Sequence, residues 1–93
     1  MKYEIHITKK AEKQLSKVPI YIKETLLLWA SSVEMVGMRE IRKIPAYHDE
    51  PLRGKRKGER SVRLSRAYRA IYRELDNGDF ILIEIIEVNK HDY

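Results

Sequence analysis

The segment Asp76-Asn77-Gly78-Asp79 constrains the fold most, because it separates two stretches with the pattern of β-strands. An Asn-Gly pair accepts positive φ at both central positions of a tight turn, so the segment predicts a hairpin. The stretch after it, residues 80–88, is apolar and rich in β-branched residues, which is typical of an interior strand. Because an isolated hairpin is barely stable in water, this pair must pack within a larger sheet.

Residues 60–73 predict a second hairpin that shares a strand with the first. A loop at residues 65–67 would pair Leu64 with Tyr68 and Val62 with Ala70, so these apolar side chains would share one face. The opposite face would then present Arg63, Arg69 and Arg73. Like charges on neighbouring strands repel, so this cluster favours a bound anion. The alternative is neutralisation by Glu59, Glu74, Glu84 or Glu87.

The first 37 residues predict a strand followed by two helices. Residues 2–7 alternate as a half-buried strand does, and Thr8 is suited to cap a helix that ends near Pro19. A second helix is expected from about residue 20 to residue 36, ended by Gly37. Its apolar stripe is Ile22, Leu26, Trp29, Val33 and Val36.

The predicted architecture is α+β, in the order β-α-α-β-β-β, with a helical hairpin packed on one face of a mainly antiparallel, twisted sheet. A chain of 93 residues fits one domain, expected to span residues 1–93. Residues 38–60 lack periodicity and predict a long functional loop, with one short strand or turn near residues 41–44. The chain has no cysteine, which excludes a disulfide framework and a thiol nucleophile.

Positive charge is concentrated in the middle of the chain. The net charge is +2 over residues 1–38, +8 over residues 39–73 and −5 over residues 74–93. Such a block favours a polyanionic partner, and the alternative is a solvated, partly salt-bridged loop. Within it, residues 51–58 have the glycines and cations of a phosphate-binding loop, although an ordinary basic turn would look similar.

The C-terminal residues His91, Asp92 and Tyr93 combine a group that titrates near neutrality, a carboxylate and an aromatic ring. The alternative is a frayed terminus. The three histidines are too scattered for a metal motif, so we expect no metal and no cofactor. The longest apolar run is far shorter than the roughly 20 residues of a membrane helix, and the polar first ten residues do not read as a signal peptide.

Several short motifs accompany this order of elements, namely His48-Asp49-Glu50-Pro51-Leu52-Arg53-Gly54, Gly58, Tyr68-Arg69, Tyr72 and Asp92-Tyr93. Together they resemble the RelE/ParE superfamily of bacterial toxins, and they are most similar to its HigB-like and YafQ-like members. The resemblance implies the toxin of a type II toxin–antitoxin pair in the bacterial cytoplasm. It implies a ribosome-dependent mRNA endoribonuclease that uses no metal and leaves 2′,3′-cyclic phosphate and 5′-hydroxyl ends. Its partners would be the ribosome, mRNA and a cognate antitoxin.

The resemblance also implies roles for individual residues. Arg69 falls where the family places an arginine on the scissile phosphate, and Arg53 falls where HigB-like members have lysine. Tyr93 matches a tyrosine that stacks on the substrate nucleotide, and His91 is the expected general acid or base. Asp92 and His48 would support the reaction. Contacts to RNA phosphates would be made by Lys55, Lys57, Arg60, Arg63 and Arg73.

Two other functions are open at this point. The first is a toxin that binds DNA gyrase. Some members of this fold have that target, and they lack the nuclease residues. The second is a basic RNA-binding module without turnover. An antitoxin would lay an amphipathic helix over an exposed groove or over the helical hairpin.

Overall fold

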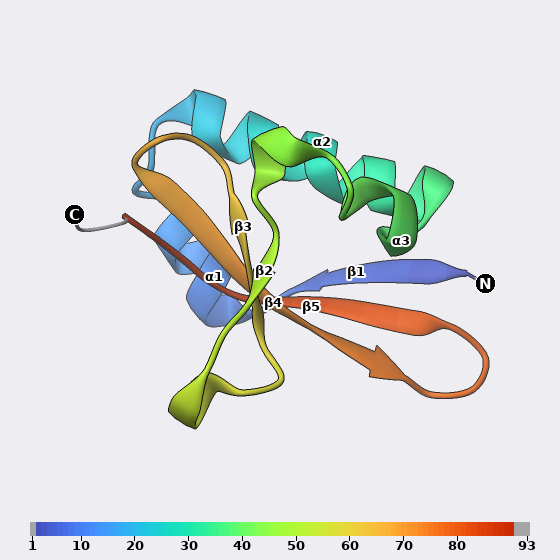
Figure 1. The fold of residues 1–93 in the computed structure, drawn as a ribbon. Helices are drawn as coiled ribbons and strands as arrows, with labels where there is room; N and C mark the ends of the chain where they lie inside the picture. The colour runs from blue at the N-terminus through green and yellow to red at the C-terminus, as the bar shows by residue number, and fades with distance from the viewer. Residues whose placement is uncertain (1, 91–93) are drawn as a thin grey trace.

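The centre of the molecule is a five-stranded sheet in the order β1-β5-β4-β3-β2 (Figure 1). The computed structural model describes residues 2–90. Strand β1 (Tyr3–Ile7) runs parallel to β5 (Ile81–Lys90). The pairs formed by β5, β4 (Tyr68–Asp76), β3 (Arg60–Arg63) and β2 (Glu50–Pro51) are antiparallel. The predicted α+β class with a mainly antiparallel sheet is therefore confirmed.

The predicted helices form, and α2 extends along one side of the sheet (Figure 1). Helix α1 spans Lys9–Leu15, and its first turn is capped by Thr8, whose Oγ1 accepts a hydrogen bond from the Ala11 N–H at 3.2 Å. Helix α2 spans Ile20–Val36 and ends at Gly37, which takes a φ of 89° that favours glycine. A short helix α3 (Met38–Ile41) follows.

The core lies between the helices and one face of the sheet. Four residues of the predicted α2 stripe are fully buried, namely Ile22, Leu26, Trp29 and Val33. The prediction that Val36 is buried with them is wrong, because it is 55% exposed. The rings of Trp29 and Tyr72 lie 5.1 Å apart between centroids, at 54°. Tyr72 is therefore a core residue that joins α2 to β4.

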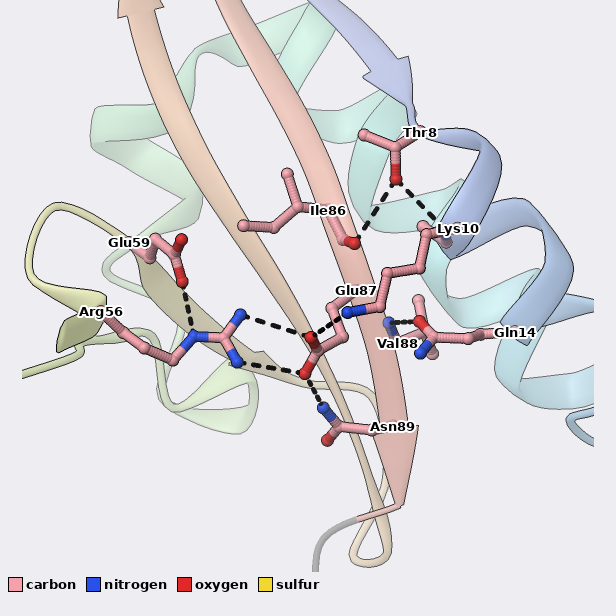
Figure 2. Close-up of polar contacts among 10 residues, drawn as sticks. Thr8, Lys10, Gln14, Arg56, Glu59, Ile86, Glu87, Val88 and Asn89 are labelled. Atoms are coloured by element: carbon pink, nitrogen blue, oxygen red, sulfur yellow. Dashed lines mark hydrogen bonds and ion pairs between the residues drawn. The ribbon is translucent and has the colours of Figure 1, made fainter.

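Helix α1 covers the edge of β5 beyond the point where β1 ends. The Thr8 N–H donates to the Ile85 carbonyl at 3.0 Å. The Thr8 Oγ1 donates to the Ile86 carbonyl at 3.4 Å, and Gln14 Oε1 accepts from the Val88 N–H at 2.7 Å (Figure 2). The ladder between β4 and β5 shifts register here, because Ile71 pairs with Glu87 and Tyr72 pairs with Ile85. Side chains of Gln14 and Thr8 thus satisfy backbone groups that a longer β1 would have satisfied.

The hairpin register predicted for β3 and β4 is confirmed, since Val62 pairs with Ala70 and the Leu64 N–H donates to the Tyr68 carbonyl at 2.9 Å. The β4–β5 turn differs in detail from the prediction. Gly78 takes a positive φ of 95°, but Asn77 does not. Instead, Asn77 Oδ1 accepts from the N–H groups of Asp79 and Phe80, each at 3.0 Å.

The segment predicted as a long loop is more ordered than expected. Besides α3 and β2, it contains 3-10 turns at Pro45–Tyr47 and Gly54–Arg56. The predicted strand or turn near residues 41–44 corresponds to the end of α3. None of the helices within residues 2–90 has the length and apolar character needed to cross a membrane.

Candidate active site

The sheet face opposite the core is the candidate site, and we call it the open face. Its side chains come from alternate positions of β3 and β4, and they include Arg63, Arg69 and Arg73 as the register predicted. Ile71 lies on the same face and is only 6% exposed, outside the main core cluster. The open face is therefore partly covered, and its cations have defined surroundings.

Arg69 is held in a fixed orientation on the open face. Its side chain is 12% exposed, and its Nη1 donates to Ser61 Oγ at 2.5 Å and to Glu50 Oε1 at 3.2 Å. Within residues 2–90, its Nε and Nη2 groups make no hydrogen bond, and neither is fully enclosed. One edge of the guanidinium is thus fixed by protein while donors remain for an anion.

Glu50 is the residue of this face that the sequence did not single out for chemistry. Its carboxylate is 46% exposed, with one oxygen on Arg69 and the other 3.4 Å from His48 Nε2. His48 takes the left-handed conformation, with φ 42°, and turns the chain into β2. A half-exposed carboxylate between a histidine and an arginine has the chemistry of a proton acceptor. In the sequence, the only sign of this role is that Glu50 stands beside Pro51 within the motif of residues 48–54.

A second cluster on this face fixes the basic loop formed by residues 52–59. Glu87, 14% exposed, accepts from Lys10 Nζ at 2.9 Å and from Arg56 Nη1 at 3.2 Å, and Asn89 also donates to it (Figure 2). Arg56 Nε donates to Glu59 Oε1 at 2.6 Å. The hydrogen bond from Lys10 lowers the pKa of Glu87 most. Burial opposes this, and the hydrogen bond from Arg56 lowers the pKa further. The loop is thereby tied to β5 and α1.

We expect Glu87→Gln to destabilise the fold in a pH-dependent way. Because the folded-state pKa is lowered, the contribution of Glu87 is complete above its ordinary value of 4.5 and is lost as the pH falls through the folded value. At pH 7 the variant should lose about 1–2 kcal/mol in free energy of unfolding. The difference should shrink as the pH falls below 4.5. Urea unfolding at several pH values measures this, with exposed Glu34→Gln as the control. A difference independent of pH would contradict this role.

The structure separates the remaining cations into two groups. Arg73 pairs with Glu84 at 2.6 Å, and Arg60 points to the other side of the sheet, where its Nε donates to Asp49. By contrast, Arg53, Lys55, Lys57 and Arg63 form no ion pair within residues 2–90, and Arg63 Nε is buried without a hydrogen-bond partner there. Only part of the predicted cationic set is therefore available to an anion.

His91, Asp92 and Tyr93 lie outside the described residues. Within residues 2–90, the structure contains no group of three or more histidine, cysteine or acidic residues arranged to hold a metal ion.

The fold is similar to those of several solved toxins. It superposes on a chain of the RelE–RelB complex of the archaeon Pyrococcus horikoshii with a TM-score of 0.72 and 22% identity, over 97% of this chain and 96% of that chain. A chain of the toxin–antitoxin complex RelBE2 of Mycobacterium tuberculosis superposes with a TM-score of 0.69 and 24% identity, over 98% of this chain and 100% of that chain. YafQ of Escherichia coli superposes with a TM-score of 0.67 and 16% identity, over 97% of this chain and 94% of that chain.

No family model and no curated protein matches the sequence. At these identities the likeness is one of three-dimensional structure, and it extends over nearly the whole of each chain. The structural neighbours are thus RelE, YoeB and YafQ toxins, and this protein has the RelE-like fold that its sequence motifs predicted.

Proposed function

We propose that this protein is the toxin of a type II toxin–antitoxin pair and that it cuts mRNA on the ribosome in the bacterial cytoplasm. The observation that supports this most is Arg69, whose guanidinium is fixed by Glu50 and Ser61 on the open face while keeping donors for a phosphate. A fold similar to those of RelE and YafQ toxins agrees with this role.

The proposed reaction needs no metal and uses the RNA as its own nucleophile. Glu50 takes the proton from a ribose 2′-hydroxyl, whose oxygen then forms a bond to the adjacent phosphorus. The bond from phosphorus to the 5′ oxygen breaks, and that oxygen receives a proton from His91. Arg69 stabilises the negative charge that grows on the phosphorane. The products are a 2′,3′-cyclic phosphate and a 5′-hydroxyl.

Substrate docking is assigned to cations around this centre. Arg53, Lys55 and Lys57 belong to the basic loop, and Arg63 pairs directly opposite Arg69 across the strands. These groups would contact RNA phosphates without reading sequence, and Tyr93 would stack on a base. Because Arg60 and Arg73 are already bound to carboxylates, we give them smaller parts in docking.

A cognate antitoxin is the proposed protein partner. Helix α2 leaves several large apolar side chains exposed, namely Ile20, Tyr21, Leu27, Leu28 and Met35. They recur along one helix at spacings that suit an amphipathic helix lying against it. We propose that the antitoxin covers this helical surface.

Sequencing the 5′ ends of mRNA after induction tests the function. We expect growth arrest together with new 5′-hydroxyl ends within translated reading frames. DNA damage responses without such cuts would favour gyrase as the target instead. Normal growth, with only salt-dependent RNA binding by the purified protein, would favour a module without turnover.

A further inference from the structure

Asp49 is a buried carboxylate that the proposed reaction does not use. Its side chain is 1% exposed, on the side of β2 opposite to Glu50. Oδ2 accepts a hydrogen bond from the Tyr72 hydroxyl at 2.5 Å, and Oδ1 accepts from Arg60 Nε at 2.6 Å. Arg42 Nε lies 3.8 Å from Oδ1. A buried charge is tolerated only with such partners, so these contacts fix its position closely.

The donors to Asp49 are themselves held by the core. Tyr72 is 0% exposed and packs against Trp29. Burial, and then the hydrogen bond to the Asp49 carboxylate, raise the pKa of the Tyr72 hydroxyl well above its ordinary value, so it remains a donor at neutral pH. Arg42 donates to the Tyr72 hydroxyl at 3.3 Å and also to Glu74. Asp49 is therefore attached, through Tyr72, to the buried core.

Strand β2 has few other means of keeping its place. It consists of Glu50 and Pro51 at the edge of the sheet, paired with Ser61 and Arg60. Proline has no N–H to donate to the ladder, and so short a strand is held weakly by backbone hydrogen bonds alone. The residue before Asp49, His48, is in the left-handed conformation, which costs conformational energy for a non-glycine residue.

We propose that Asp49 is a positioning residue, whose bonds to Tyr72 and Arg60 hold β2 so that Glu50 meets Arg69 on the open face. Successive residues of a strand point to opposite faces. Fixing the Asp49 side chain on the core side of the sheet therefore also fixes where Glu50 lies on the open face. This inference rests on the proposed function for its catalytic consequence. The anchoring of β2 does not depend on that function.

The test is Asp49→Asn in the full chain, with two readouts. The first is hydrogen exchange at Leu52, whose N–H donates to the Glu59 carbonyl at 2.9 Å just beyond β2. We expect about tenfold faster exchange there, with β4 and β5 unchanged. The second is cleavage of ribosome-bound mRNA, where kcat should fall about 10- to 100-fold while KM stays the same, because the phosphate-binding cations remain.

The matched control is Asp79→Asn, the same change at an exposed residue of the β4–β5 turn, which should alter neither readout. Unchanged hydrogen exchange at Leu52 in Asp49→Asn would overturn the anchoring of β2. Faster exchange together with an unaltered kcat would overturn the positioning role of Asp49. A wild-type chain that cuts no RNA contradicts the proposed function instead, and the exchange rates still decide whether Asp49 holds β2.

Tyr72→Phe provides a second variant in case Asp49→Asn does not fold. It keeps the ring that packs on Trp29 and removes only the hydroxyl bonded to Asp49. We expect the same changes at smaller size, about threefold in exchange and in kcat. Equal behaviour of Tyr72→Phe and wild type in both readouts would overturn the proposal as well.

Discussion

Replacing Arg69 with alanine is expected to abolish the growth arrest caused by induction and to lower the rate of mRNA cleavage by about 10²- to 10³-fold. The guanidinium is fixed by Ser61 and Glu50 on the open face and is still able to donate further hydrogen bonds. Its loss would remove the group that balances charge on the phosphorane. The fold should survive, because Glu50 is half-exposed and can be solvated when its partner is removed.

The matched control is Arg39→Ala, which removes an exposed arginine from α3. It should retain full toxicity. Arg69→Lys should fall between the two, because lysine keeps the positive charge and loses the planar fork of donors. Undiminished toxicity of a folded Arg69→Ala protein would show that the open face does not perform the chemistry.

Glu50→Gln should give the second large loss, about 10²- to 10⁴-fold in the rate of the chemical step, with unchanged binding of RNA. Glutamine has the same shape and can still accept the hydrogen bond from Arg69, but it cannot take a proton from the 2′-hydroxyl. Single-turnover cleavage separates the rate of the step from binding. The Glu24→Gln variant, altered on the exposed surface of α2, serves as the control.

A Glu50→Gln protein with normal single-turnover rates would rule out Glu50 as the proton acceptor. His48 would then be the next candidate, because it contacts Glu50 and is itself exposed. Testing His48→Ala in the same assay would decide this, and a large loss there together with a silent Glu50→Gln would reassign the base.

The sequence predicted the parts of the fold that follow from periodicity. The α2 stripe and the Val62–Ala70 register both depend on regular spacing of apolar residues, and both are confirmed. The prediction for Val36 was wrong: its spacing continues the stripe, but it is 55% exposed, and spacing within one helix does not show whether its last turn is covered. The ordered turns between residues 38 and 60 were missed because they depend on contacts with distant strands.

The candidate site was predicted less completely, for a related reason. Alternation along β3 and β4 was enough to place Arg63 and Arg69 on one face. The neutralisation of Arg56 by Glu87 and of Arg73 by Glu84 depends on which residues face one another across the sheet. Glu50 and Asp49 lie on opposite faces of the sheet because of the short strand β2, for which the sequence has no periodic signal. The roles assigned to His91, Asp92 and Tyr93 stay predictions.

The most direct measurement of the central claim is the chemistry of the RNA ends left by the purified protein on programmed, translating ribosomes. Mass spectrometry of the upstream fragment should find a 2′,3′-cyclic phosphate for the wild-type protein and intact mRNA for Arg69→Ala. Intact mRNA with the wild-type protein, or a 3′-hydroxyl end on the fragment, would contradict the account.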